Sequence, residues 1–100
     1  MKFWYFKFEG EFPKGSPEHG YKGVFSSCLV PESNYQKAKS IFLGALKENE
    51  INLVEVTEHF AVDGEELDPE DEQNTFWIKW YNEAKKKKEL IFDKWHVFNE

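Results

Sequence analysis

The densest group of chemically capable side chains in this sequence is acidic and lies in residues 63–72. Seven carboxylates occur there: Asp63, Glu65, Glu66, Asp68, Glu70, Asp71 and Glu72. Carboxylate oxygens suit hard cations such as calcium, but their spacing does not match an EF-hand loop, so we predict no metal site. Acids from Asp68 onward would suit the start of a helix. Glu65 and Glu66 precede that start and favour a surface for a basic partner, which we expect to comprise Glu65, Glu66, Asp68 and Glu70.

Three histidines could act as bases or metal ligands, and they are His19, His59 and His96. None has a metal-like spacing to another, and His59 and His96 fall in predicted strands, where we expect structural roles. His19 lies in a loop rich in glycine and proline, and such loops often carry catalytic groups. An alternative function is therefore a small hydrolase or isomerase that uses His19 or an acidic residue as general base. No catalytic motif is present, and the sequence predicts no cofactor.

Cys28 is the only cysteine, so no internal disulfide can form. Secreted domains of this size usually carry several disulfides, which favours the cytoplasm for this chain. Lys7 and Glu9 also interrupt the apolar N-terminal residues too early for a signal peptide. A nucleophilic thiol needs an exposed, electropositive setting, whereas free cysteines are commonly buried as small apolar side chains. We predict that Cys28 is buried and unreactive.

The charge balance excludes several classes of partner. The 100 residues carry a formal net charge of −6, and all 13 basic residues are lysines. Nucleic acids and anionic membranes are bound through clustered lysine and arginine, and the planar arginine fork that suits phosphate is missing altogether. No apolar run approaches the roughly 20 residues of a membrane span. We therefore expect a protein partner, with a basic surface, rather than a nucleic acid or a membrane.

Periodicity predicts four strands and two helices in one domain that spans residues 1–100. The strands are expected at residues 2–12, 21–30, 51–62 and 89–98, and apolar and polar side chains alternate in the first and the third of these. Glu58 breaks the alternation of the third strand, which indicates a bulge or an edge. A capping box at Ser33 and Gln36 predicts a helix that ends near Asn49. Asp68 and Pro69 predict the start of a second helix.

These elements follow in the order β-β-α-β-α-β, which predicts an α+β fold. We expect two layers, with a mixed four-stranded sheet and both helices packed on one face. The apolar side chains of the second helix should face the core, and they are Phe76, Trp77, Trp80, Tyr81 and Ala84.

The leading hypothesis is a small acidic domain without catalytic activity that binds a protein. Its partner would be basic, and the domain would neutralise or regulate it as an inhibitor or immunity protein does, because complementary fields accelerate association. Besides the hydrolase or isomerase that uses His19, a structural homodimer is a further alternative.

Overall fold

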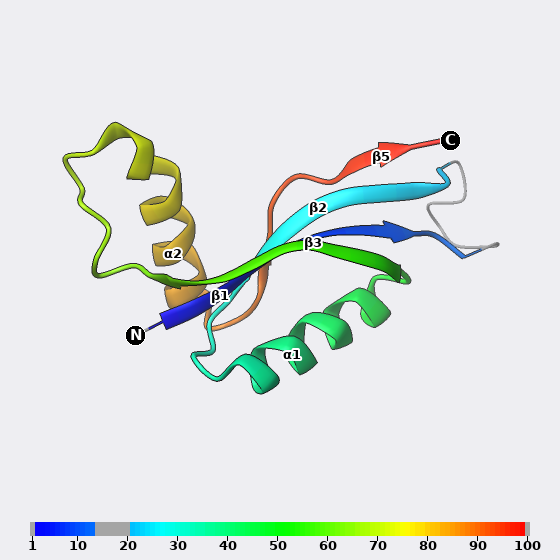
Figure 1. Ribbon diagram of the computed structural model, residues 1–100, viewed down its shortest axis with the longest axis horizontal. Coiled ribbons are helices and arrows are strands. Elements are labelled where there is room, and N and C mark those ends of the chain that lie inside the picture. Colours follow the sequence, from blue (N-terminus) through cyan, green and yellow to red (C-terminus); the bar gives the residue numbers. More distant parts are fainter. Residues whose placement is uncertain (1, 14–20, 100) are drawn as a thin grey trace.

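The computed structural model describes residues 2–13 and 21–99 and confirms the α+β class (Figure 1). In chain order the elements are β1 (Lys2–Glu11), β2 (Gly23–Val30), α1 (Tyr35–Glu48), β3 (Asn52–Asp63), the short 3-10 helix η1 (Glu72–Asn74), α2 (Thr75–Lys87), β4 (Ile91–Phe92) and β5 (His96–Phe98).

The strands form one sheet in the order β3-β1-β2-β4, and β5 also pairs with β2. Every pairing among the described residues is antiparallel, so the predicted mixed sheet is wrong. The physical reason is that β1 lies between β2 and β3. Those two strands run in the same direction, but each pairs with β1 instead of with the other.

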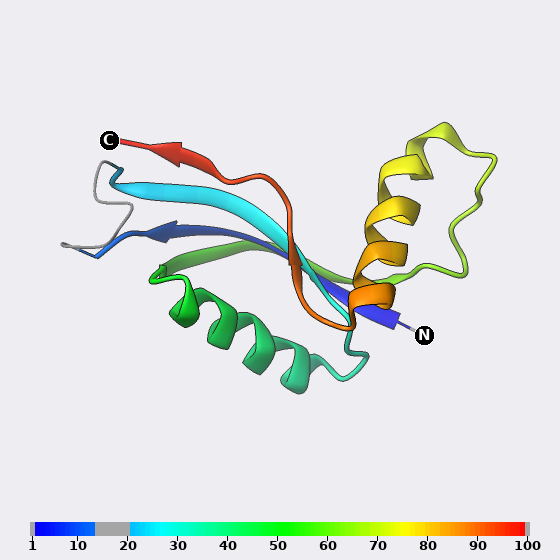
Figure 2. The ribbon, with the colours of Figure 1, turned by 180° about the vertical axis from the view of Figure 1, so that it is seen from behind.

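The two helices lie on opposite faces of the sheet, and the prediction that both pack on one face is therefore wrong. Side chains of a strand alternate between faces, and β1 is apolar on both. Phe6 lies 4.6 Å from the α1 residue Phe42 between ring centroids, and Phe3 lies 4.4 Å from the α2 residue Tyr81. Each apolar face needs a cover, so each receives its own helix, with α1 below the strands and α2 above them (Figures 1 and 2).

Both predicted helix starts are displaced. The N-cap of α1 is Asn34 and not Ser33. The Asn34 side-chain oxygen accepts a hydrogen bond from the Lys37 amide at 3.0 Å. The predicted end at Asn49 is confirmed, since Asn49 is the C-cap. The second helix begins at Thr75 and not at Asp68, because the Asp68 carboxylate accepts from the nearby Glu70 amide and forms a turn.

The predicted fourth strand is divided into β4 and β5, which pair with different parts of β2. The chain between them is held by Ser26, whose hydroxyl lies 3.3 Å from the Asp93 carbonyl and 3.1 Å from that of Lys94. The Asp93 amide donates to the Ser27 carbonyl at 2.8 Å. The side chain of a neighbouring strand therefore satisfies carbonyl groups that a continuous ladder would otherwise engage.

β3 is an edge strand with two irregularities, which confirms the prediction made from Glu58. Lys7 and Phe8 of β1 are opposite Glu58 and Val56, so Thr57 has no partner residue on β1. An extra residue reverses the alternation of faces. Val56 consequently packs against the α1 side of the core, while Phe60 and Val62 pack against the α2 side. Uninterrupted alternation along residues 51–62 would have placed these three side chains on one face.

Candidate functional site

The acidic stretch after β3 is shaped by its aspartates. Asp63 accepts a hydrogen bond from the Glu65 amide at 3.1 Å, Asp68 from the Glu70 amide at 2.9 Å, and Asp71 from the Gln73 amide at 3.0 Å. Each aspartate thus bonds the backbone two residues further on, which is the geometry of an Asx turn. These carboxylates build the loop that connects β3 to α2.

The glutamates of the same stretch have a different role. Glu65, Glu66 and Glu70 are exposed, and within the described part of the chain no hydrogen bond or ion pair engages their carboxylates. Asp68, the fourth predicted binding residue, is also exposed, although one of its oxygens is engaged by the Glu70 amide. The three glutamates are therefore available to a partner, and Asp68 contributes mainly to the shape of the loop.

Beside this loop is a hollow of about 400 Å³ between the end of β3 and the first turns of α2. Its apolar lining includes Phe60, Leu67 and Trp77, and its acidic lining is Asp63 and Glu66. The Phe60 and Trp77 rings are 5.8 Å apart between centroids. The hollow therefore combines aromatic surface with carboxylates at its margin, and it brings Glu66 beside residues of β3.

Further carboxylates that the sequence analysis did not assign to a site lie on the α2 side of the sheet, beyond the part that α2 covers. Glu9 is paired directly with Glu55, and Lys7 with Glu58. Glu55 and Glu58 are exposed on β3. We call the acidic residues of β3 and of the loop directly after it the acidic edge: Glu55, Glu58, Asp63, Glu65 and Glu66. The charged positions within the strand pattern were the available sequence signal, but only the pairing of β1 with β3 places them together.

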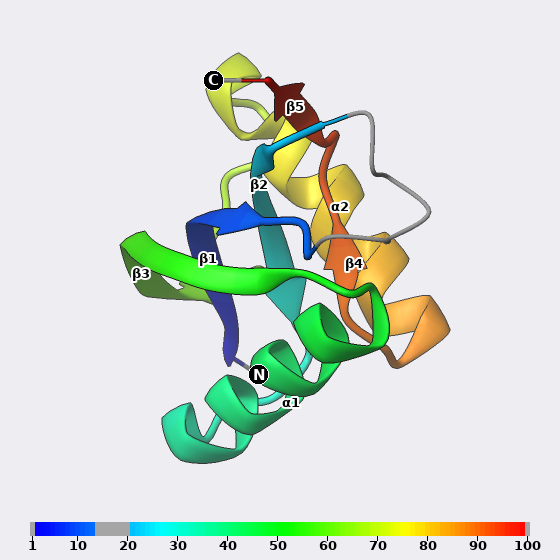
Figure 3. The ribbon, with the colours of Figure 1, turned by 90° about the vertical axis from the view of Figure 1, so that its right-hand side faces the viewer.

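The acidic edge lies along an outer margin of the sheet. β3 pairs with β1 on one side, and among the described residues no strand pairs with its other side. Figure 3 shows β3 at the margin of the sheet, with β1 and β2 following it inward. The backbone groups on this free side, together with the carboxylates, are accessible to another molecule.

Among the described residues, the groups that could support catalysis do not converge. His19 lies outside the described residues. His59 is exposed and its ring centroid is 5.5 Å from that of Tyr35, near α1, whereas His96 is exposed on β5. No group of three or more histidine, cysteine, aspartate or glutamate side chains that could hold a metal occurs among residues 2–13 and 21–99.

The buried ionisable groups are poor nucleophiles. Cys28 has no exposed surface, which confirms its predicted burial, and this burial raises the pKa of its thiol well above the ordinary value. Burial also raises the pKa of the Tyr5 hydroxyl, an effect that a hydrogen bond with Ser27 opposes. A raised pKa disfavours the anion that would act as nucleophile.

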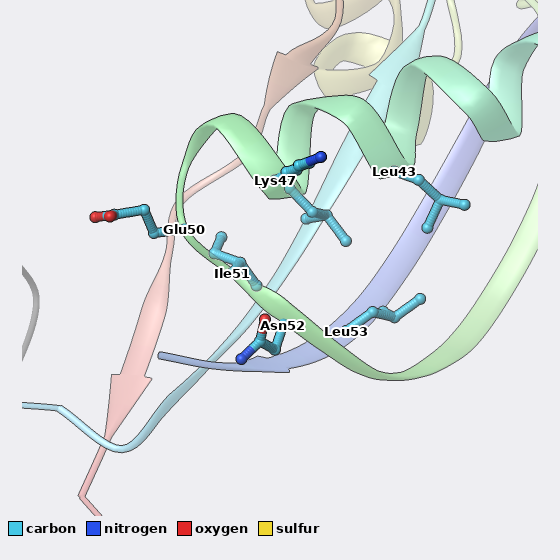
Figure 4. A pocket seen from close by; sticks show the side chains of 7 residues that line it. Leu43, Lys47, Glu50, Ile51, Asn52 and Leu53 are labelled. Atoms are coloured by element: carbon cyan, nitrogen blue, oxygen red, sulfur yellow. The ribbon is translucent and has the colours of Figure 1, made fainter. Parts of the chain in front are cut away.

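A second hollow, of about 370 Å³, lies between the end of α1 and the start of β3 (Figure 4). Leu43, Leu46, Ile51 and Leu53 line it, and Glu50 extends away from the other labelled side chains. Its polar side chains, Lys47, Glu50 and Asn52, point in different directions, so this hollow lacks the convergent polar groups of an active site.

No family model, no curated protein and no solved structure matches the chain. Within the described residues, neither helix has both the length and the apolar character that crossing a membrane requires.

Proposed function

We propose that this protein is a binding domain without catalytic activity, and that its acidic edge binds a protein with a basic surface. One observation carries the proposal. Within the acidic edge, Glu58 and Asp63 lie opposite Lys7 and Lys2 of β1, but Glu55, Glu65 and Glu66 have no cationic partner among the described residues, where the single ion pair within 4.0 Å joins Lys87 to Glu83 on α2. A surface with unpaired charge of one sign is suited to a partner with the opposite charge.

The pairing of Glu9 with Glu55 supports the same function. Like charges directly opposite one another in a sheet are destabilising. Lys7 lies on the same face two residues before Glu9, but its direct cross-strand partner is Glu58 and not Glu55. A basic partner would relieve this repulsion when it binds. Its charge would also be attracted from a distance, which raises the rate of association at low salt. Such a domain would neutralise or regulate the partner by covering its basic surface.

The proposed compartment is the cytoplasm. The chain has one cysteine, and burial keeps it from pairing with another molecule. Domains of this size that work outside the cell usually rely on disulfides. The domain would fold in the cytoplasm without forming a disulfide, and it could bind a partner in that compartment.

Affinity capture from cells that produce the protein tests the function. The bait is compared with a triple variant of the acidic edge, Glu55→Gln, Glu65→Gln and Glu66→Gln. The matched control removes three exposed carboxylates elsewhere, with Glu48→Gln, Glu50→Gln and Glu89→Gln. We expect the wild type and the control to retain a common basic protein, identified by mass spectrometry, and the acidic-edge variant to lose it.

The kinetics of the purified pair give the second measurement. The association rate should fall as salt rises, because the Debye length shortens from about 10 Å at 0.1 M to about 3 Å at 1 M. The acidic-edge variant should associate slowly at low salt and show little further change. Equal retention of the same partner by both triple variants, with an association rate that is indifferent to salt, would show that binding does not use the acidic edge.

A further inference from the structure

The part of β3 that continues into the acidic loop is a regular, accessible edge. From Glu58 to Asp63 the strand pairs residue by residue with β1, from Lys7 back to Lys2, and both irregularities of β3 lie before this segment. Proteins usually protect free edges with bulges, proline or very short strands. The segment Glu58–Asp63 shows none of these three devices and is protected only by the charges of Glu58 and Asp63, which disfavour an acidic strand. Glu58, His59 and Ala61 are exposed. Its outer side can therefore accept another strand.

The side chains of this segment that point to the α2 face change from acidic to apolar along the strand. Glu58, Phe60 and Val62 share that face, because the strand alternates regularly after the irregularity at Thr57. Phe60 and Val62 continue into the hollow lined by Leu67, Trp77 and Glu66. A strand added beside this segment would place every second side chain next to Glu58 or over the hollow.

The hollow suits a long cationic side chain. The stems of lysine and arginine pack on apolar surface while their charged ends remain at a polar margin. Here Phe60 and Trp77 offer aromatic faces, which attract cations, and Glu66 offers a carboxylate that no described residue engages. On the other face, His59 and Ala61 offer no carboxylate, and the carboxylate of Asp63 already accepts a hydrogen bond from the Glu65 amide.

We infer that an extended segment of the basic partner adds as a strand to the free edge of Glu58–Asp63, and that it inserts a lysine or arginine into the hollow of Phe60, Trp77 and Glu66. The inference rests on the proposed function and specifies how the partner is recognised. Main-chain hydrogen bonds provide affinity in strand addition, and pockets for alternate side chains provide specificity. The segment should carry cations at alternate positions, with uncharged residues between them.

A second copy of this chain is a poorer occupant of the same edge. Antiparallel pairing of two Glu58–Asp63 segments would bring Glu58 of each copy toward the acidic loop of the other. Like charges across strands are destabilising. Lys7 and Lys2 of β1 lie opposite Glu58 and Asp63, but no described lysine forms an ion pair with Glu65 or Glu66 of the loop. The charge of the edge therefore favours a basic segment of another protein.

Synthetic peptides test the mode of binding. The probe is an octapeptide in which lysine and threonine alternate. One control has four lysines followed by four threonines, and another has proline in place of a central threonine of the probe. All three peptides have the same charge, but only the alternating one combines the expected spacing with an uninterrupted set of backbone donors. Affinity is measured by nuclear magnetic resonance titration of the full chain.

We expect the alternating peptide to bind about tenfold more tightly than either control, which corresponds to about 1.4 kcal/mol. Amide signals of Glu58–Asp63 and the Trp77 indole signal should shift, and amides on the free side of β3 should exchange more slowly with solvent. Glu66→Gln should weaken binding several-fold, because a charge-assisted contact is lost. The matched control Glu48→Gln removes an exposed glutamate of α1 that does not line the hollow, and it should have an effect of less than about twofold.

Equal affinity for the three peptides would overturn strand addition while leaving the proposed acidic binding function intact. Failure of the alternating peptide to shift these signals at millimolar concentration would overturn it too, and capture of the whole partner would then decide the proposed function separately. A doubled mass by light scattering, with the β3 amides protected in the absence of peptide, would show that a second copy occupies the edge.

Discussion

Glu9 on β1 and Glu55 on β3 are direct cross-strand partners, so two carboxylates of like charge face one another on the part of the sheet that α2 leaves uncovered. Neither carboxylate is engaged by a lysine of the described chain. The arrangement weakens the fold locally and strengthens the acidic field along β3. It links the stability of the domain to its proposed function.

Glu55→Gln should therefore stabilise the free protein. Removing one of two opposed charges should raise the free energy of unfolding by a few tenths of a kcal/mol, up to about 0.5 kcal/mol. Urea denaturation at low salt measures the change. Glu50→Gln removes an exposed carboxylate elsewhere and should not give this gain. The gain should shrink in 1 M salt, and an equal gain at both salt concentrations would contradict the electrostatic explanation.

The aspartates and glutamates of the acidic loop should respond differently to substitution. Asp68→Ala removes the acceptor of the Glu70 amide and should cost about 0.5–1.5 kcal/mol of stability. Asp68→Asn retains an acceptor oxygen and should cost less. Glu70→Gln should change stability by less than about 0.5 kcal/mol, as exposed substitutions usually do. Chemical denaturation of the three variants would contradict this division if Glu70→Gln proved the most destabilising.

Trp80 should be among the most important side chains for stability. It is 5% exposed and its ring contacts Tyr5, Phe76 and Trp77 with centroids 5.3–5.9 Å away. Trp80→Ala should cost about 3–5 kcal/mol, as other large-to-alanine core substitutions do, and Trp80→Phe should cost less. Phe76→Ala is the control on the same helix, because Phe76 is 51% exposed and its predicted place in the core is wrong. Similar denaturation midpoints for the two alanine variants would show that Trp80 is not part of the core.

Cys28 should react slowly with a thiol reagent in the folded protein and rapidly in denaturant. The side chain has no exposed surface and burial favours its neutral form. A spectrophotometric thiol assay measures both rates. Ser40→Cys in a Cys28→Ala background supplies an exposed reference thiol on α1, which should react rapidly under native conditions. Equal native rates for the two thiols would contradict the burial of Cys28.

Alkaline pH should destabilise the fold through the same residue. The pKa of Cys28 is raised in the folded state, so the folded protein keeps its proton while the unfolded chain loses it above about pH 8.5. The contribution of Cys28 to the free energy of unfolding is therefore fully present below that pH. It declines as pH rises toward the folded pKa, by at most about 1.4 kcal/mol per pH unit. Denaturation between pH 8 and pH 10 should show a steeper decline for the wild type than for Cys28→Ala. Identical slopes would contradict this linkage.

Local patterns predicted much of the secondary structure. The first strand, the C-cap at Asn49 and the burial of Cys28 followed from alternation and turn chemistry that act over a few residues. The start of the first helix was wrong because Asn34 caps it in place of Ser33. The start of the second was wrong because the bond from the Glu70 amide to Asp68 closes a turn that does not continue as a helix, and α2 begins only at Thr75. Energies of neighbouring turns are too similar for residue types alone to choose between them.

The sequence by itself determined an acidic chain with no arginine, one buried cysteine, alternating strands and an exposed group of glutamates after β3. Only the tertiary structure decided that α1 and α2 cover opposite faces, that the last predicted strand is divided at Ser26, and that Glu9 meets Glu55. These features depend on the register between segments far apart in the chain. One extra residue at Thr57 exchanges the two faces of a strand, so the position of every later side chain depends on pairing that no local pattern contains.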